Sequence, residues 1–86
     1  MNDAQAADSD DAARVRRYEH PAKRRYYALW AQRDLFGQWC LMRAWGGMNS
    51  RLGRLVISPI PDLTECLALM NHEARRRGKR GYARVR

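Results

Sequence analysis

The residues best suited to chemistry in this chain surround one glycine-rich stretch. Trp45 is followed by Gly46 and Gly47, and a polar loop then runs to Gly53. An indole ring stacks on a nucleic-acid base for about 1–3 kcal/mol, and a glycine backbone can approach a phosphate closely. This combination indicates a site for a phosphate-bearing ligand.

Arginines flank the same loop, at positions 43, 51 and 54. Their guanidinium groups can hold phosphate oxygens through paired hydrogen bonds. If Arg43, Arg51 and Arg54 converge, they form a phosphate clamp around Trp45. The alternative is three separately solvated arginines and a tryptophan that packs against its own loop or covers the sheet edge. The sequence leaves both interpretations open.

A second basic segment lies at the end of the chain, where seven of the last twelve residues are Arg or Lys and none is acidic. Such a run is usually a solvated surface, and arginines near a helix C-terminus also stabilise the helix dipole. The lack of acids nevertheless indicates contact with a polyanion. We predict two binding areas, made of Arg43, Trp45, Gly46, Gly47, Arg51 and Arg54 around the loop, and of Arg76, Arg77, Lys79 and Arg80 near the C-terminus.

The distribution of charge supports a polyanionic partner. The first 13 residues hold four acids and no base, whereas residues 14–86 hold all 17 bases against five acids, which leaves +12. Self-repulsion of that size is unfavourable unless a polyanion is near. We expect DNA, with RNA as an open alternative. About five phosphate contacts predict a log–log salt slope of about −4.

Other classes of function find no support. Cys40, Cys66, His20 and His72 lack the spacing of a zinc site, and the glycines match neither a dinucleotide nor a P-loop fingerprint. We therefore expect no enzyme, metal, cofactor or small-molecule substrate. No apolar run approaches the ~18 residues of a membrane span. The cysteines are interpreted as buried thiols of a cytoplasmic protein, nucleoid-associated if it binds DNA.

Three strands are predicted, at residues 26–32, 39–45 and 54–58. Turn residues at 34–37 join the first two as an antiparallel hairpin, with Gly37 free to take a positive φ and Phe36 tucked over the core. The second strand is apolar on both faces and should lie inside the sheet. Pro59 restricts the third strand to an edge or ends its pairing.

One amphipathic helix follows. Asp62 is the predicted N-cap, with Glu65 at the capping-box spacing, and apolar residues recur at helical spacing from Leu63 to Ala74. Gly78 is the predicted end, and Glu73 can pair with Arg77. The fold class is therefore α+β, a sheet of three to four strands packed against one helix. Residues 1–24 are interpreted as a disordered acidic and then flexible basic tail, 25–82 as the domain and 83–86 as a basic tail.

The order of these features resembles the WGR domain family over about residues 25–82. The shared features are a Tyr-rich first strand, the turn Asp34-Leu35-Phe36-Gly37, Trp39, Trp45-Gly46, Gly53, the capped helix and Gly81-Tyr82. WGR domains occur in DNA-dependent poly(ADP-ribose) polymerases and as small stand-alone bacterial proteins. The resemblance implies the α+β fold predicted above.

The resemblance also implies DNA binding near a strand break. In the polymerases the motif tryptophan packs against the terminal sugar, which would be the role of Trp45. The motif arginine falls on Gly47, so either end recognition is lost or Arg43, Arg51 or Arg54 supplies the charge. No ADP-ribosyl transfer is implied. The alternative function is a protein-interaction module whose loop 46–53 or sheet edge docks an acidic partner.

Overall fold

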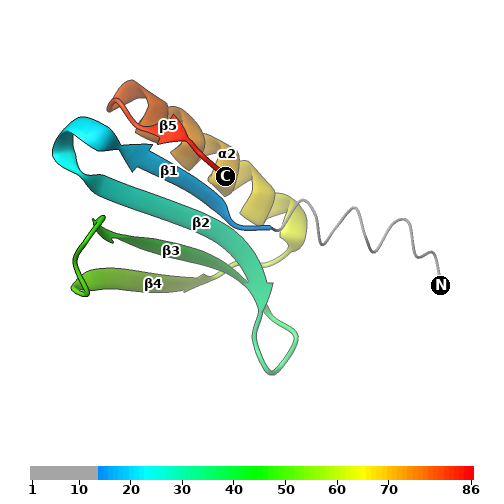
Figure 1. Ribbon diagram of the computed structural model, residues 1–86. Helices are drawn as coiled ribbons and strands as arrows, with labels where there is room; N and C mark the ends of the chain where they lie inside the picture. The colour runs from blue at the N-terminus through cyan, green and yellow to red at the C-terminus, as the bar shows by residue number, and fades with distance from the viewer. Residues whose placement is uncertain (1–13) are drawn as a thin grey trace.

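The computed structural model describes residues 14–86, in which one helix lies across one face of an antiparallel sheet (Figure 1). The strand order is β4-β3-β2-β1-β5. The α+β class predicted from the sequence is confirmed, with five strands where three to four were expected. The elements in chain order are β1 (Arg16–His20), a 3-10 helix η1 (Pro21–Lys23), β2 (Arg25–Arg33), β3 (Trp39–Gly47), β4 (Gly53–Pro59), α2 (Leu63–Lys79) and β5 (Ala83–Arg84).

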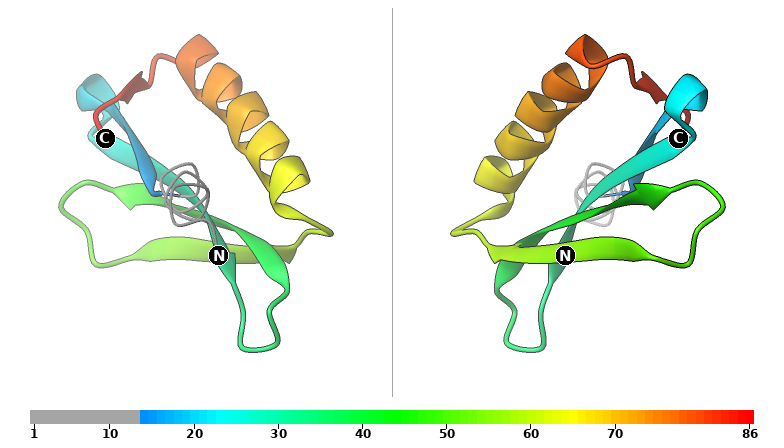
Figure 2. Two further views of the ribbon diagram at one scale, coloured as in Figure 1. Left: turned by 90° about the vertical axis from the view of Figure 1, so that its right-hand side faces the viewer. Right: turned by 90° about the vertical axis from the view of Figure 1, so that its left-hand side faces the viewer.

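The β2–β3 hairpin is confirmed, and β3 lies inside the sheet between β2 and β4 as predicted. Its turn is closed by Asp34, whose Oδ1 accepts hydrogen bonds from the backbone N–H groups of Phe36 and Gln38 at 2.9 and 3.0 Å. Gly37 has a φ of 81°. Phe36, however, is 95% exposed, so the prediction that it tucks over the core is wrong. The turn projects beyond the sheet, away from the helix (Figure 2).

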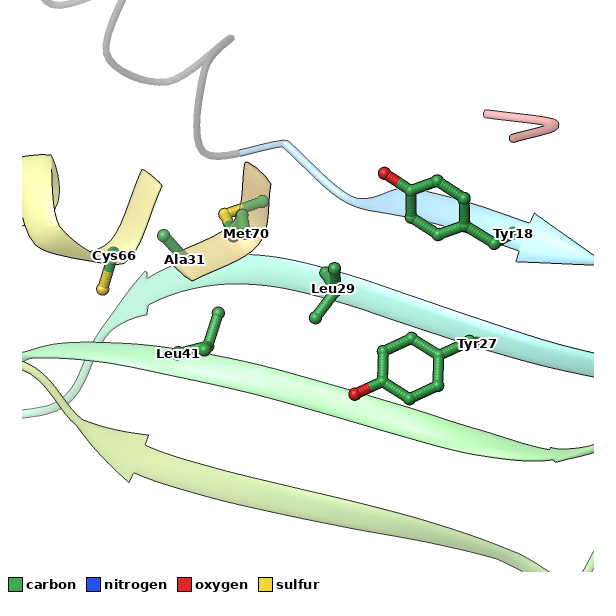
Figure 3. Close-up of a cluster of buried hydrophobic side chains, with 7 residues drawn as sticks. All are labelled: Tyr18, Tyr27, Leu29, Ala31, Leu41, Cys66 and Met70. Atoms are coloured by element: carbon green, nitrogen blue, oxygen red, sulfur yellow. The ribbon is translucent and has the colours of Figure 1, made fainter. Parts of the chain in front are cut away.

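The core lies between the sheet and α2. Leu29 of β2 is fully buried against Cys66 and Met70 of α2, and four further side chains complete the cluster (Figure 3). Side chains directly opposite each other on paired strands share one face, so the register sets which residues meet the helix. Cys40 and Cys66 are buried free thiols, as predicted.

The basic segment 14–24, predicted to be flexible, is structured. β1 pairs along its length with β2, and its Tyr18 is buried in the core. The prediction failed because Tyr18 is the one buried residue of the strand. With polar or charged residues on both sides of it, the sequence shows no alternation of apolar and polar side chains. Residues 83–84, predicted to be tail, pair with β1 as β5. The predicted disorder of residues 1–13 lies outside the described residues.

The N-cap of α2 is confirmed, since Asp62 Oδ1 accepts from the Glu65 N–H at 2.8 Å. The predicted end at Gly78 is wrong, because the helix continues to Lys79. Gly81 instead takes the left-handed conformation, with φ 89°, and the Tyr82 N–H donates to the Arg77 carbonyl at 3.0 Å. A Cβ at Gly81 would lie 2.9 Å from His20 Nε2. This helix is neither long nor apolar enough to cross a bilayer.

Replacing Leu29 by alanine is expected to lower the free energy of unfolding by about 2–5 kcal/mol, because it opens a cavity where no solvent reaches. Urea titration followed by circular dichroism measures the change. The matched control is Leu35→Ala at the fully exposed hairpin turn, for which a shift of at most about 0.5 kcal/mol is expected. Equal effects of the two substitutions would contradict the assignment of the core.

Candidate nucleic-acid interface

An open cavity of about 440 Å³ lies between the sheet and the C-terminal half of α2. Its volume falls within the roughly 300–1,000 Å³ of small-ligand sites. Six of its ten lining side chains are cationic and one is acidic. The lining residues are Lys23, Arg25, Tyr27, Arg43, Trp45, Glu73, Arg76, Arg77, Arg80 and Tyr82.

The sheet register builds one wall of this cavity. Tyr27 of β2 stands directly opposite Trp45 of β3, and Leu29 opposite Arg43. Opposite residues share a face, so Trp45 and Arg43 both point to the side that carries the helix. Trp45 is half-buried and packs against the core cluster. The tryptophan therefore has both a packing role and a surface on the cavity.

The last turns of α2 build the facing wall. The lining residues Glu73, Arg76, Arg77 and Arg80 recur at helical spacing, which places them on one side of the helix. Past the helix end, the turn at Gly81 brings Tyr82 back over the sheet, where its ring meets that of His20 at a centroid distance of 5.4 Å.

Aromatic rings and guanidinium groups contact each other inside the cavity. The rings of Tyr27 and Trp45 stack with centroids 5.7 Å apart and an interplanar angle of 8°. The Arg77 Cζ atom lies 4.3 Å from the centre of the Tyr27 ring and 5.6 Å from that of Tyr82. Such contacts stabilise a cation by about 0.5–2 kcal/mol. They hold the indole and one arginine in fixed positions.

Glu73 is the one buried charged residue of the described chain. Its carboxylate lies 3.2 Å from Arg76 Nη1 and 3.9 Å from Arg77 Nη2, which confirms the predicted pairing of Glu73 with Arg77. The Tyr27 hydroxyl donates to the same carboxylate at 3.4 Å. Glu73 thus joins the helix to the sheet and partly neutralises two arginines.

Four cationic residues of the cavity have no ion pair within the described residues. These are Lys23, Arg25, Arg43 and Arg80. The cavity therefore keeps a surplus of positive charge beyond what Glu73 can balance, and its electrostatic potential favours an anionic ligand.

The structure brings together five of the ten residues predicted to bind: Arg43, Trp45, Arg76, Arg77 and Arg80. They come from both predicted areas, the loop and the C-terminal segment, which here form one cavity. Arg51, Arg54 and Lys79 are exposed outside it. The binding role of all ten residues stays a prediction.

The two glycines have different surroundings. A Cβ at Gly46 would lie 3.0 Å from the Leu52 carbonyl oxygen, so a side chain here would force the backbone of its own loop to shift. A Cβ at Gly47 would meet only the Ser50 Cβ, at an ordinary 3.4 Å. Position 47 therefore has room for a side chain. Neither glycine lines the cavity.

Sequence reasoning missed five of the lining residues: Lys23, Arg25, Tyr27, Glu73 and Tyr82. Arg25 stands directly opposite Gly47 in the sheet, so its side chain leaves on the same face as a side chain at position 47 would. Arg25 could have been found from the sequence. Pairing the two predicted strands outward from their turn places Arg25 opposite Gly47. Lys23 and Tyr82 carry no such signal, because their places depend on η1 and on the turn at Gly81.

Two of three comparisons with known proteins found nothing, since no curated protein and no solved structure matches the chain. One family model matches, that of the WGR domain, over residues 11–86. The match covers nearly the whole chain and extends through β1, the strand that sequence reasoning assigned to the tail.

Burial raises the pKa of the Tyr27 hydroxyl above its ordinary 10.0, and the Glu73 carboxylate raises it further, while Arg43 and Arg77 oppose the shift. The neutral phenol is thus favoured in the folded protein. The resulting stabilisation is present below pH 10 and is lost as the pH rises through the folded-state pKa, because the unfolded chain ionises first.

Glu73→Gln is therefore expected to lower the pKa of Tyr27, since it removes the negative charge and retains the burial. NMR titration of ring-labelled tyrosine measures both values, with Tyr27→Phe identifying the resonance. A Tyr27 pKa at or below 10 in the unsubstituted protein would contradict the packing described above.

Proposed function

We propose that this chain, which belongs to the WGR domain family, is a non-catalytic module that binds DNA through the cavity between the sheet and α2. WGR domains are small binding modules, generally non-catalytic and associated with nucleic acid. The observation that carries the proposal is the convergence of six cationic side chains beside Trp45. Phosphate groups are the ligands that such a surplus of guanidinium groups binds best.

The cations are arranged so that a phosphate chain can pass over the cavity. Lys23 comes from η1, Arg25 from the start of β2, Arg43 from the middle of β3 and Arg80 from the helix end. Each contact with a phosphate releases condensed counterions. Six such contacts would give a log–log salt slope of roughly −5 for duplex DNA.

Trp45 supplies the apolar part of the interface. Its ring is held parallel to Tyr27, so little side-chain entropy is left to lose when a sugar or base packs on it. By resemblance to the polymerase domains, the partner of this ring is the sugar at a strand end. The proposal therefore includes a preference for nicked DNA.

We propose that Arg25 supplies the charge that Gly47 lacks. The two residues are cross-strand neighbours, and Arg25 lines the cavity while Gly47 does not. The three arginines suggested by the sequence are less well placed as a group, since Arg51 and Arg54 lie outside the cavity.

The first test compares Arg75 of α2 with Arg80, the C-cap residue of the same helix; both carry the same charge. Arg80 lines the cavity, whereas Arg75 is exposed outside it. Arg80→Glu is expected to weaken binding to a fluorescein-labelled duplex more than tenfold, and Arg75→Glu less than threefold, as measured by fluorescence anisotropy. Because both substitutions change the net charge equally, general electrostatics cannot produce the difference. Equal weakening would contradict the cavity as the site.

The second test concerns strand ends. A duplex with one 5′-phosphorylated nick is expected to bind more tightly than the intact duplex, and Arg25→Ala is expected to remove that preference. Arg51→Ala, which shortens an exposed loop arginine, is the control and should retain it. Equal affinity of the unsubstituted protein for both duplexes would contradict end recognition and leave backbone binding. No binding near physiological salt would favour docking of an acidic protein instead.

A further inference from the structure

The outer edge of β4 is unpaired within the described residues. β4 ends the sheet, with β3 as its one neighbour. The Ile60 N–H donates to the Trp39 carbonyl at 2.9 Å, and hydrogen-bonded positions alternate along an antiparallel pair. The backbone groups of Leu55 and Ile57 therefore point away from β3, to the open edge.

The side chains of this edge are apolar and accessible. Leu55 and Ile57 are 52% and 56% exposed, on the face of the sheet opposite the helix. On β3 they stand opposite Ala44, which is partly exposed, and Met42, which is buried. Edge strands are commonly protected from association by charged side chains, proline, bulges or a short length. In β4 these devices are confined to its ends, at Arg54 and Pro59. The seven-residue β4 has no charged residue from Leu55 to Pro59.

We propose that this edge pairs with β4 of a second copy of the chain, in antiparallel orientation about Val56. In this register Leu55 of each copy stands opposite the partner's Ile57, and their outward N–H and C=O groups form hydrogen-bonded pairs. The four apolar side chains then form one cluster on the open face. Arg54 falls opposite the partner's Ser58, so no like charges face each other across the strand pair.

Neighbouring registers fit less well. A shift of two residues in one direction places Ile57 opposite the partner's Gly53, which offers no side chain to pack against. A shift in the other direction places Leu55 opposite the partner's Pro59, which has no N–H to donate. A shift of one residue would place opposite each other a residue whose backbone groups point outward and one whose groups already bond to β3, so hydrogen-bonded pairs could not form. Pairing about Val56 also sets Gly53 opposite the partner's Pro59, but only at the two ends of the joint. It is the register that places both Leu55–Ile57 pairs at the centre.

The paired dimer is one continuous sheet, and opposite residues share a face, so both helices lie on the same side. The interface is small, and each copy carries a formal net charge of +8. Salt screens the repulsion between two such copies. Association should therefore strengthen with salt, whereas DNA binding weakens with it. The inference is independent of the proposed function, and the two can fail separately.

The register is tested by cysteine trapping in the full chain. Residues of a non-hydrogen-bonded antiparallel pair have Cα atoms about 4.5 Å apart, within the roughly 4.4–6.8 Å that a disulfide requires. Val56→Cys is expected to form an interchain disulfide under mild oxidation at least tenfold faster than Leu55→Cys, which faces the partner's Ile57. Cys40 and Cys66 are buried and should not compete. Equal rates for the two variants, or no disulfide in either, would overturn the register.

The dimer itself is tested by sedimentation velocity over a series of protein and salt concentrations. A concentration-dependent dimer that strengthens between about 0.1 and 1 M NaCl is expected. Ile57→Lys places a charge in the joint and should leave a monomer, whereas Leu35→Lys at the exposed turn should leave the dimer unchanged. Circular dichroism checks that both variants fold. A monomer at all conditions, or a folded Ile57→Lys that still dimerises, would overturn the proposal.

Discussion

The contact on which this structure most depends is made by the buried carboxylate of Glu73. It receives the Tyr27 hydroxyl from the sheet and lies against two arginines of its own helix. Without an anion at this point, the guanidinium groups of α2 would face that of Arg43 across a partly desolvated space, where repulsion between like charges is strong. One acid therefore allows a basic helix end to pack against a basic sheet. It does not balance the other four cationic residues, which give the cavity its positive electrostatic potential.

The fold concentrates residues that are far apart in the sequence. β2 and β3 bring Tyr27 next to Trp45, and α2 crosses back over them so that its last turns face the same two strands (Figure 2). The sheet fixes the indole through stacking, and the helix fixes the arginines through its spacing. Neither element forms the cavity alone. Its composition thus follows from how the helix is docked, which the seven-residue core cluster determines.

Features set by local physics could be predicted from the sequence. The Asp62 cap and the β2–β3 hairpin depend on neighbours within a few residues, and the structure confirms both. Features set by tertiary contact could not. β1 is recognisable by little more than Tyr18, and the close approach of Gly81 to His20 joins segments far apart in the sequence. That the two basic areas form one cavity could not be predicted either, because it depends on where the helix lies over the sheet.

The pairing of β1 with β5 has a consequence for how the chain folds. β2, β3 and β4 are joined by short connections and can form from local contacts, but Tyr18 pairs with Arg84 at the far end of the described chain. Closing so long a loop is entropically unfavourable and slows folding. Two lining residues of the cavity, Lys23 and Tyr82, lie next to the two strands that close this loop. A meander of β2, β3 and β4 alone would hold Trp45 with Arg25 and Arg43 but without the cations of the helix end, so the cavity is complete only when segments far apart in the chain have joined.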